Sequence, residues 1–244
     1  MAWLFNLKPK IEIENTDSQY LIRNTIYKFF SQVCWHQYIR QTIEGWDVLI
    51  NKELIEENTE ITQEAIQLLT LKLQEIKEVL PLERRLLLMR TKIWIEKSMA
   101  DFSGMVYHPS AKWLKSHGYN PKKLKSIEIT NIENFIKWES TQPWHVLHEF
   151  AHAYHHQIIT YDFQPLIKAY QHAQEQCLYQ AVPRNNGRIT TSYALKNVRE
   201  YFAELSEAYF GLNDFYPFTR EQLKIYDIQG YCAVEAAWNI ADID

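Results

Sequence analysis

One pentapeptide, His-Glu-Phe-Ala-His at residues 148–152, constrains this chain more than any other feature. It lies in a stretch whose apolar residues recur at helical spacing and would cover one face of a helix: Trp144, Leu147, Phe150 and Ala151. Thr141 is the expected N-cap of this helix, and Pro143 fits its first turn. We therefore predict a helix that begins near residue 141 and packs one face against the rest of the protein.

The spacing of His148 and His152 favours a metal site, because residues four apart lie on the same face of a helix. Glu149 projects toward the same cleft, where it can take a proton from a zinc-bound water. Two other interpretations stay open. The histidines could be incidental residues of a surface helix, or His152 could pair with His156, although Ala153 then stands where the general base is needed.

A catalytic zinc ion commonly has three protein ligands and one open position. The extended motif with a third histidine needs Gly at position 155 and His at position 158, and the chain has His155 and Ile158 there. A carboxylate ligand remains. Residues 197–211 read as a helix that stops at a glycine, and its Glu200 and Glu204 are four residues apart. One of them can bind the metal while the other orients a ligand histidine.

Local structure offers another explanation for the same acidic residues. Asn197 followed by Glu200 is close to a capping box, and many helices begin this way. Glu204 and Glu207 also fit ordinary solvated charges. Spacing alone therefore leaves the choice between Glu200 and Glu204 open.

Residues 191–204, Thr-Ser-Tyr-Ala-Leu-Lys-Asn-Val-Arg-Glu-Tyr-Phe-Ala-Glu, resemble the third-ligand region of the anthrax-lethal-factor-like metallopeptidases. More distantly they resemble the Mlc titration factor peptidases. The resemblance implies that Glu200 is a zinc ligand beside the two histidines, that Glu204 orients a ligand histidine, and that Tyr193 donates a hydrogen bond to the oxyanion. It covers roughly residues 141–211 and rests on two motifs in the expected order. Ala151 replaces a glycine common in the lethal factor motif, and the chain has no room for the toxin's other domains.

The length of 244 residues and the apolar content of 46% predict one compact domain, residues 1–244, with two lobes around a cleft. We expect an α+β, zincin-like fold: a sheet-containing lobe over residues 1–140 and a helical lobe with the metal site over residues 141–244. The predicted strands are a hairpin over 38–50 that turns at Glu44-Gly45, and segments 91–96 and 127–130, the last two half-buried. The predicted helices, besides the metal helix, span 18–36, 60–80, 162–179, 197–210, 219–227 and 230–239.

Charge and cysteine content narrow the class of protein. The net charge of −4 is spread along the chain and gives no reason to expect nucleic acid. Cys34, Cys177 and Cys232 are far apart and odd in number, so we expect buried thiols in a reducing compartment. The N-terminus lacks a signal-peptide pattern, and no apolar run approaches membrane-spanning length. A cytoplasmic protein without a membrane partner is predicted, and its oligomeric state stays open.

Residues 103–126 contain no acidic side chain, but they contain five lysines: Lys112, Lys115, Lys122, Lys123 and Lys125. This segment reads as a solvated loop or, alternatively, as a positive rim that attracts acidic substrate segments. Zincins commonly hold peptides along an edge strand beside the metal helix, and Ile127–Thr130 is the candidate strand. We expect His145 to be an exposed polar residue, and His155 and His156 to lie at the far side or end of the metal helix.

These patterns predict a zinc-dependent metallopeptidase of the glutamate-ligand class that acts on peptides or proteins. His148, His152 and Glu200 would bind Zn²⁺, and Glu149 would act as the general base. Tyr193 and the zinc ion would stabilise the oxyanion, and Glu204 would orient a ligand histidine. The alternative is a zincin-like binding or regulatory protein with weak or no hydrolytic activity.

Overall fold

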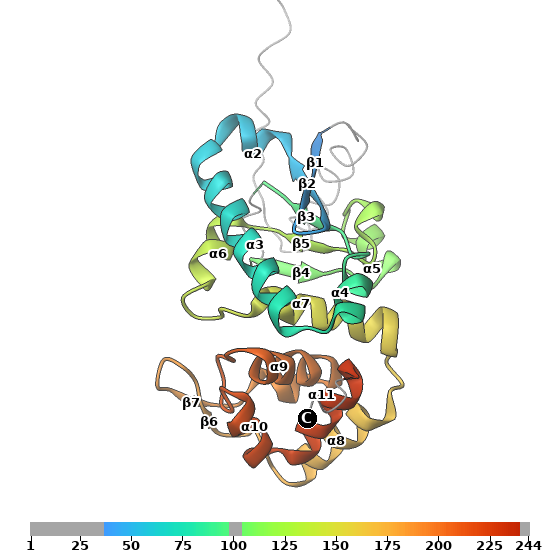
Figure 1. Ribbon diagram of the computed structural model, residues 1–244, viewed down its shortest axis with the longest axis vertical. Coiled ribbons are helices and arrows are strands. Elements are labelled where there is room, and N and C mark those ends of the chain that lie inside the picture. Colours follow the sequence, from blue (N-terminus) through green and yellow to red (C-terminus); the bar gives the residue numbers. More distant parts are fainter. Residues whose placement is uncertain (1–36, 98–103, 240–244) are drawn as a thin grey trace, which may run out of the picture.

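The computed structural model describes residues 37–97 and 104–239, so the helix predicted over 18–36 and Cys34 lie outside the described residues. The protein is α+β, with a mixed five-stranded sheet in the order β1-β2-β3-β5-β4 (Figure 1). The strands are β1 (Tyr38–Ile43), β2 (Trp46–Asn51), β3 (Ile93–Ile95), β4 (Met105–Tyr107) and β5 (Ile127–Ile129). A small hairpin, β6 (Val182–Pro183) and β7 (Ile189–Thr190), lies apart from this sheet.

The helices alternate with the strands in the first part of the chain and dominate the second part (Figure 1). They are α2 (Lys52–Glu57), α3 (Thr59–Val79), α4 (Leu82–Leu88), α5 (Ala111–Ser116), α6 (Ile132–Trp138), α7 (His145–Tyr154), α8 (Gln164–Glu175), α9 (Val198–Phe210), α10 (Arg220–Tyr226) and α11 (Ile228–Trp238). Short turns of other helix types are η1 (Pro121–Lys123), η2 (His155–Ile159) and η3 (Tyr193–Lys196). Within the described ranges, none of these helices combines the length and the apolar character that a bilayer-spanning segment requires.

Most of the predicted elements are confirmed with small shifts of their ends. The β1–β2 hairpin turns at Glu44 and Gly45, which both have positive φ, as a tight two-residue turn requires. Helix α8 ends four residues earlier than predicted, because Cys177 and Tyr179 adopt positive φ and turn the chain away. Cys177 and Cys232 are exposed, so the expectation of buried thiols is wrong for both.

The sheet packs on α7, and its aliphatic side chains form one buried cluster with side chains of α3 and α6; among them are Ile93, Ile95, Ile127 and Ile129. The opposite face carries Trp94 and Glu128 and is also buried, so the prediction of half-buried strands is wrong. Lys123 explains this burial, since its ammonium lies 2.6 Å from Glu96 and 2.8 Å from Glu128. His108 completes the pairing of Glu128 at 2.6 Å. Charged groups tolerate burial when each has such partners.

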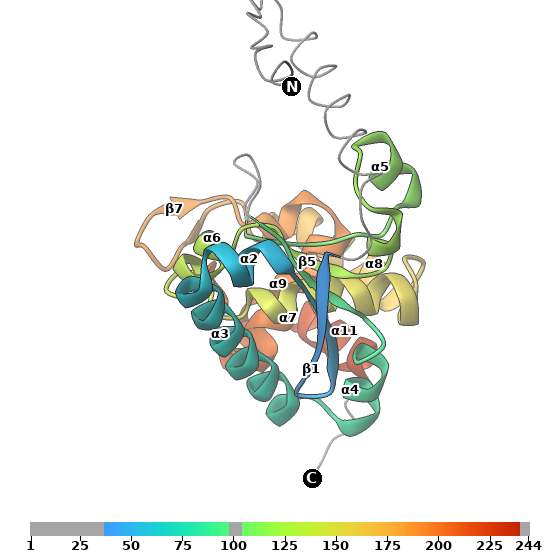
Figure 2. The same ribbon diagram turned by 90° about the horizontal axis from the view of Figure 1, so that it is seen from above.

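The lysine-rich segment is partly helical and is not one solvated loop. It forms α5 and η1, and only Lys123 among its five lysines is buried. Figure 2 shows α5 and α3 on opposite sides of the strands.

Strand β5 is internal, because it pairs with β3 on one side and with β4 on the other. The expectation that Ile127–Thr130 offers a free edge is therefore wrong, and β4 is the edge strand next to α7.

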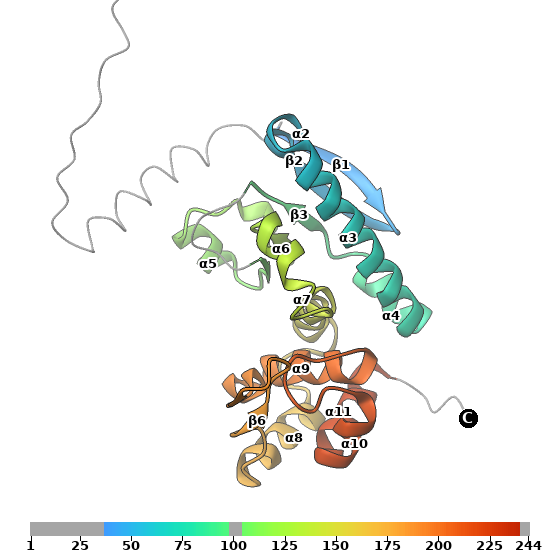
Figure 3. The ribbon, with the colours of Figure 1, turned by 90° about the vertical axis from the view of Figure 1, so that its left-hand side faces the viewer.

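Helix α7 lies between the sheet and the helices of the second half of the chain (Figure 3). Phe150 contacts Trp46 on the sheet side, with ring centroids 5.5 Å apart. Tyr154 stacks on Trp238 of α11 at 4.2 Å on the other side. This double burial fixes the helix that carries the histidine pair. Its first residue is His145, so Thr141 does not cap it as predicted; the Thr141 hydroxyl donates to the carbonyl of Trp138 instead.

Candidate metal centre

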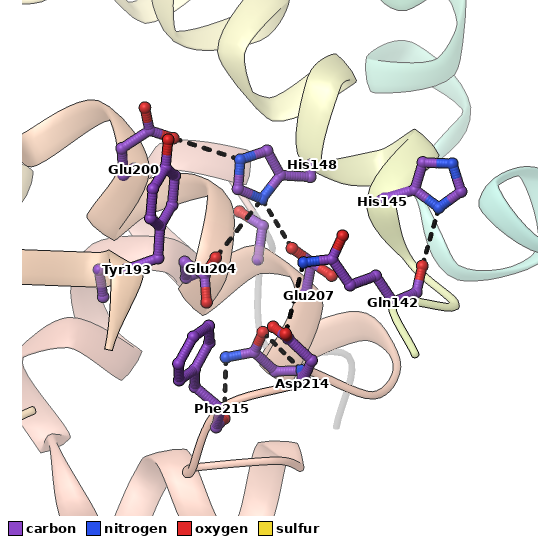
Figure 4. A network of polar contacts seen from close by, with 12 residues as sticks. Gln142, His145, His148, Tyr193, Glu200, Glu204, Glu207, Asp214 and Phe215 are labelled. Carbon is purple, nitrogen blue, oxygen red and sulfur yellow. Dashed lines mark hydrogen bonds and ion pairs between the residues drawn. The ribbon is translucent and has the colours of Figure 1, made fainter. Parts of the chain in front are cut away.

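His148 and His152 on α7 and Glu200 on α9 converge on one point. The Oε2 atom of Glu200 lies 3.3 Å from Nε2 of His148 and 3.0 Å from Nε2 of His152. Asn197 begins α9 as predicted, and its side chain accepts hydrogen bonds from the backbone N–H groups of Arg199 and Glu200. The capping role thus belongs to Asn197, and the Glu200 carboxylate is free to face the histidines. Figure 4 shows Glu200 directed at His148.

These three side chains fit a zinc ion in both geometry and chemistry. Two ligands of a tetrahedral zinc, each roughly 2.0–2.1 Å from the metal, lie about 3.3 Å from each other. The observed separations between the carboxylate and imidazole atoms, 3.0 and 3.3 Å, are close to this ligand–ligand distance. The three candidate ligand atoms all lie within 4.8 Å of one another. Burial acts to raise the pKa of Glu200, but the two histidines outweigh it and hold the pKa well below its usual range. Glu200 therefore carries a negative charge at neutral pH, as a carboxylate ligand of a metal ion requires.

Glu149 is held at the edge of the sheet. Its Oε2 accepts a hydrogen bond of 2.7 Å from the backbone N–H of Tyr107 in β4. Burial raises the pKa of Glu149, and the nearby His152 and His148 and the Tyr107 N–H act in the opposite direction. The carboxyl is thus fixed beside the histidine pair with one oxygen not engaged by β4, as a proton acceptor in a cleft requires.

Glu207 is a further site residue, which the sequence pattern had indicated only as an ordinary solvated charge. Its Oε1 accepts a hydrogen bond of 2.6 Å from Nδ1 of His148, while Glu204 Oε1 lies 3.9 Å from the same atom (Figure 4). The structure therefore places the orienting contact on Glu207, one helical turn beyond the predicted Glu204. The spacing from Glu200 to Glu207 is seven residues, or two turns of α9, and this was the available signal.

Both of these acids are buried, with 2% of Glu204 and 3% of Glu207 exposed, so neither is the solvated charge considered above. Burial and the charge of Glu207 raise the pKa of Glu204 well above its usual range. Burial also raises the pKa of Glu207, and the hydrogen bond from His148 opposes this. The pKa of Glu204 is thus raised more strongly than that of Glu207, and Glu207 is the acceptor for the histidine.

Tyr193 precedes α9 in η3 and lines the same cavity as Glu149 and His148. Its hydroxyl accepts a hydrogen bond from the ammonium of Lys196, which also lies 3.7 Å from Oε1 of Glu200. In Figure 4 the tyrosine ring stands next to Glu200 and Glu204. The location is compatible with the predicted role at an oxyanion.

The remaining histidines of this region do not join the three ligands. His145 is buried, not exposed as predicted, and its Nδ1 donates to the carbonyl of Gln142 at 2.8 Å, on the side away from Glu200 (Figure 4). Burial lowers the pKa of His145 to about 4. His155 is fully buried at the end of the helix, and His156 bonds to the hydroxyl of Tyr107 at 2.8 Å. The competing pair of His152 and His156 gains no third ligand among the described residues.

The candidate metal centre opens into a cavity of about 510 Å³ between α7, α9 and the edge strand β4. Its lining includes Met105, Val106 and Tyr107 of β4, the site residues above, and Tyr161, Arg184, Lys196, Arg199 and Phe215. Gly211 at the end of α9 allows α7 and α9 to approach closely here. A Cβ atom at this position would lie 1.8 Å from the ring of Trp144 at the start of α7.

A comparison with models of known protein families finds none that matches the chain, and comparisons with curated proteins and with solved structures find no match either.

Proposed function

We propose that this protein is a zinc-dependent metallopeptidase with a zincin-like fold, of the type that the lethal-factor-like resemblance implies. The convergence of His148, His152 and Glu200 carries the proposal, because two imidazoles and one carboxylate form a donor set of catalytic zinc sites. When bound, zinc would lower the pKa of a water molecule and polarise the carbonyl that is attacked.

The residues around this point supply the remaining parts of a hydrolytic site. Glu149 takes a proton from the attacking water on a carboxylate oxygen and passes it to the leaving amine. Glu207 fixes the ring of His148 through Nδ1, so that Nε2 faces Glu200 and His152. Tyr193 donates its hydroxyl hydrogen to the carbonyl oxygen of the substrate as negative charge develops there.

The substrate would lie between α7 and the free edge of β4. The N–H of Tyr107 already bonds to Glu149, so the edge strand and the general base meet at one place. An extended peptide that pairs with β4 would pass directly beside this carboxylate. The predicted alternative, a binding protein without hydrolysis, has less support, since ligands, base and tyrosine all line one cavity.

The zinc content of purified protein tests the proposal. Wild-type protein is expected to contain about one zinc ion per chain, held by two neutral histidines and one carboxylate. His148→Ala and His152→Ala should each lose it, while circular dichroism stays native. Full zinc retention in both variants would overturn the site.

A further inference from the structure

One end of the cavity carries a guanidinium that no carboxylate of the described residues neutralises. Arg199 lines the cavity directly before Glu200 on α9, and its side chain is exposed. Its guanidinium contacts the amide oxygen of Asn197 and lies over the ring of Tyr161, 5.7 Å from the centroid. Among the described residues, no carboxylate forms an ion pair with it.

Arg184 also lines the cavity, but its charge is neutralised within the protein. Two of its guanidinium nitrogens donate to one oxygen of the buried Asp214, at 2.9 and 2.7 Å. Two of the hydrogen-bond donors of the Arg184 guanidinium are thus already occupied within the protein. Arg184 therefore has an internal counter-ion, and Arg199 has none within residues 37–97 and 104–239.

Two lysines are close to this part of the cavity, and one of them, Lys196, lies 3.7 Å from Oε1 of Glu200. Lys196 is one turn before Glu200 and lines the cavity with Arg199. Lys125 lies near His156, whose pKa is lowered first by burial and then by this ammonium group. His156 in turn stacks on Tyr161, the ring beneath Arg199, with centroids 5.2 Å apart. Of the five lysines considered as a positive rim, Lys125 is thus near His156, but it does not line the cavity.

We propose that Arg199, with Lys196 beside it at this end of the cavity, binds a carboxylate of the substrate and makes the enzyme prefer acidic residues beside the cleaved bond. The inference rests on the proposed peptidase function. An exposed guanidinium presents paired donors that match a carboxylate, and the ring of Tyr161 keeps it in place. The carboxylate can come from an Asp or Glu side chain or from a peptide C-terminus.

Two randomised peptide libraries separate these sources, one with amidated and one with free C-termini. The wild-type enzyme is expected to cleave amidated peptides with Asp or Glu at one position near the bond at least ~10-fold better than those with Asn or Gln, the range of a charge-assisted hydrogen bond. A preference for bonds next to a free C-terminus, seen only in the second library, would assign the carboxylate to the peptide end. Either pattern supports the inference if Arg199→Gln abolishes it.

Further variants test the role of charge itself. Arg199→Glu should turn the preference toward Lys and Arg, and Arg199→Lys should retain part of it. Arg188→Gln is the matched control, because Arg188 is an exposed arginine of the β6–β7 hairpin outside the cavity lining, and it should leave the preference unchanged.

Binding provides a readout apart from cleavage. An acidic peptide taken from the library should bind zinc-loaded Glu149→Gln protein at least ~10-fold more tightly than its amide counterpart, and the added Arg199→Gln substitution should remove this difference. Equal cleavage and binding of acidic and amide peptides would overturn the inference and leave the peptidase function intact. If no peptide is cleaved or bound at all, the proposed function fails and the inference fails with it.

Discussion

Replacement of Glu207 tests how the structure orients His148, the first of the proposed zinc ligands. The carboxylate of Glu207 accepts the 2.6 Å hydrogen bond from Nδ1 of His148, whereas Glu204 lies 3.9 Å from that nitrogen. Removal of such a partner of a ligand histidine typically costs 10–100-fold in metal affinity, or about 1.4–2.8 kcal/mol. Glu207→Ala should reach the upper part of this range, since it leaves a buried N–H without an acceptor. Glu207→Gln should stay near ~10-fold, because the amide oxygen still accepts a weaker bond.

Zinc affinity measured by competition with a chelator at pH 7.5 gives these values directly, and circular dichroism verifies the fold. Glu204→Gln is the control: it changes an equally buried acid on the same helix that makes no hydrogen bond to His148. Its zinc affinity should fall by clearly less than ~10-fold. If Glu204→Gln weakens zinc binding more than Glu207→Gln does, the assignment of the orienting residue is wrong by one helical turn.

Three other outcomes follow from the site. Glu200→Ala should lose most bound zinc by elemental analysis, because one of three ligands disappears; retention of zinc would contradict its role. Tyr193→Phe should keep zinc and lower kcat, since only an oxyanion donor is lost, and an unchanged kcat would exclude that role. His145 has a folded pKa of about 4 and an ordinary value of 6.5, so the unfolded chain binds the proton first as pH falls. Its contribution to stability is therefore present above pH 6.5 and is lost between 6.5 and 4. In urea unfolding of the zinc-free proteins, the loss of stability from pH 7 to pH 5 should be smaller for His145→Gln than for wild type by on the order of 2 kcal/mol.

The sequence was most informative where local pattern decides structure. The helical spacing predicted α3 and α9, the alternating segments predicted β3 and β5, and Glu44-Gly45 predicted the first hairpin. Within the site, spacing on one helix was enough to bring His148 and His152 together. These features depend on contacts within a few residues along the chain.

Features that depend on tertiary pairing were not predictable in this way. The second face of the sheet was predicted to be exposed, but it is buried. Lys123, which is distant in sequence from Glu96, neutralises the charge of Glu96 and so allows this burial. The edge strand was misassigned because the order of β5 and β4 reverses their order in the chain. Glu207 was missed because its partner His148 lies 59 residues away on another helix.

Cleavage by Glu149→Gln protein, compared with wild type, tests the central claim most directly. The substitution keeps the size of the side chain and an oxygen that can accept the N–H of Tyr107, but it removes the proton acceptor. Both proteins are loaded with zinc, their metal content is measured, and each is incubated with an unstructured protein substrate. The account predicts equal zinc content and a rate of peptide-bond cleavage lower by at least ~10²-fold in the variant. Cleavage at the wild-type rate by zinc-loaded Glu149→Gln protein would contradict it.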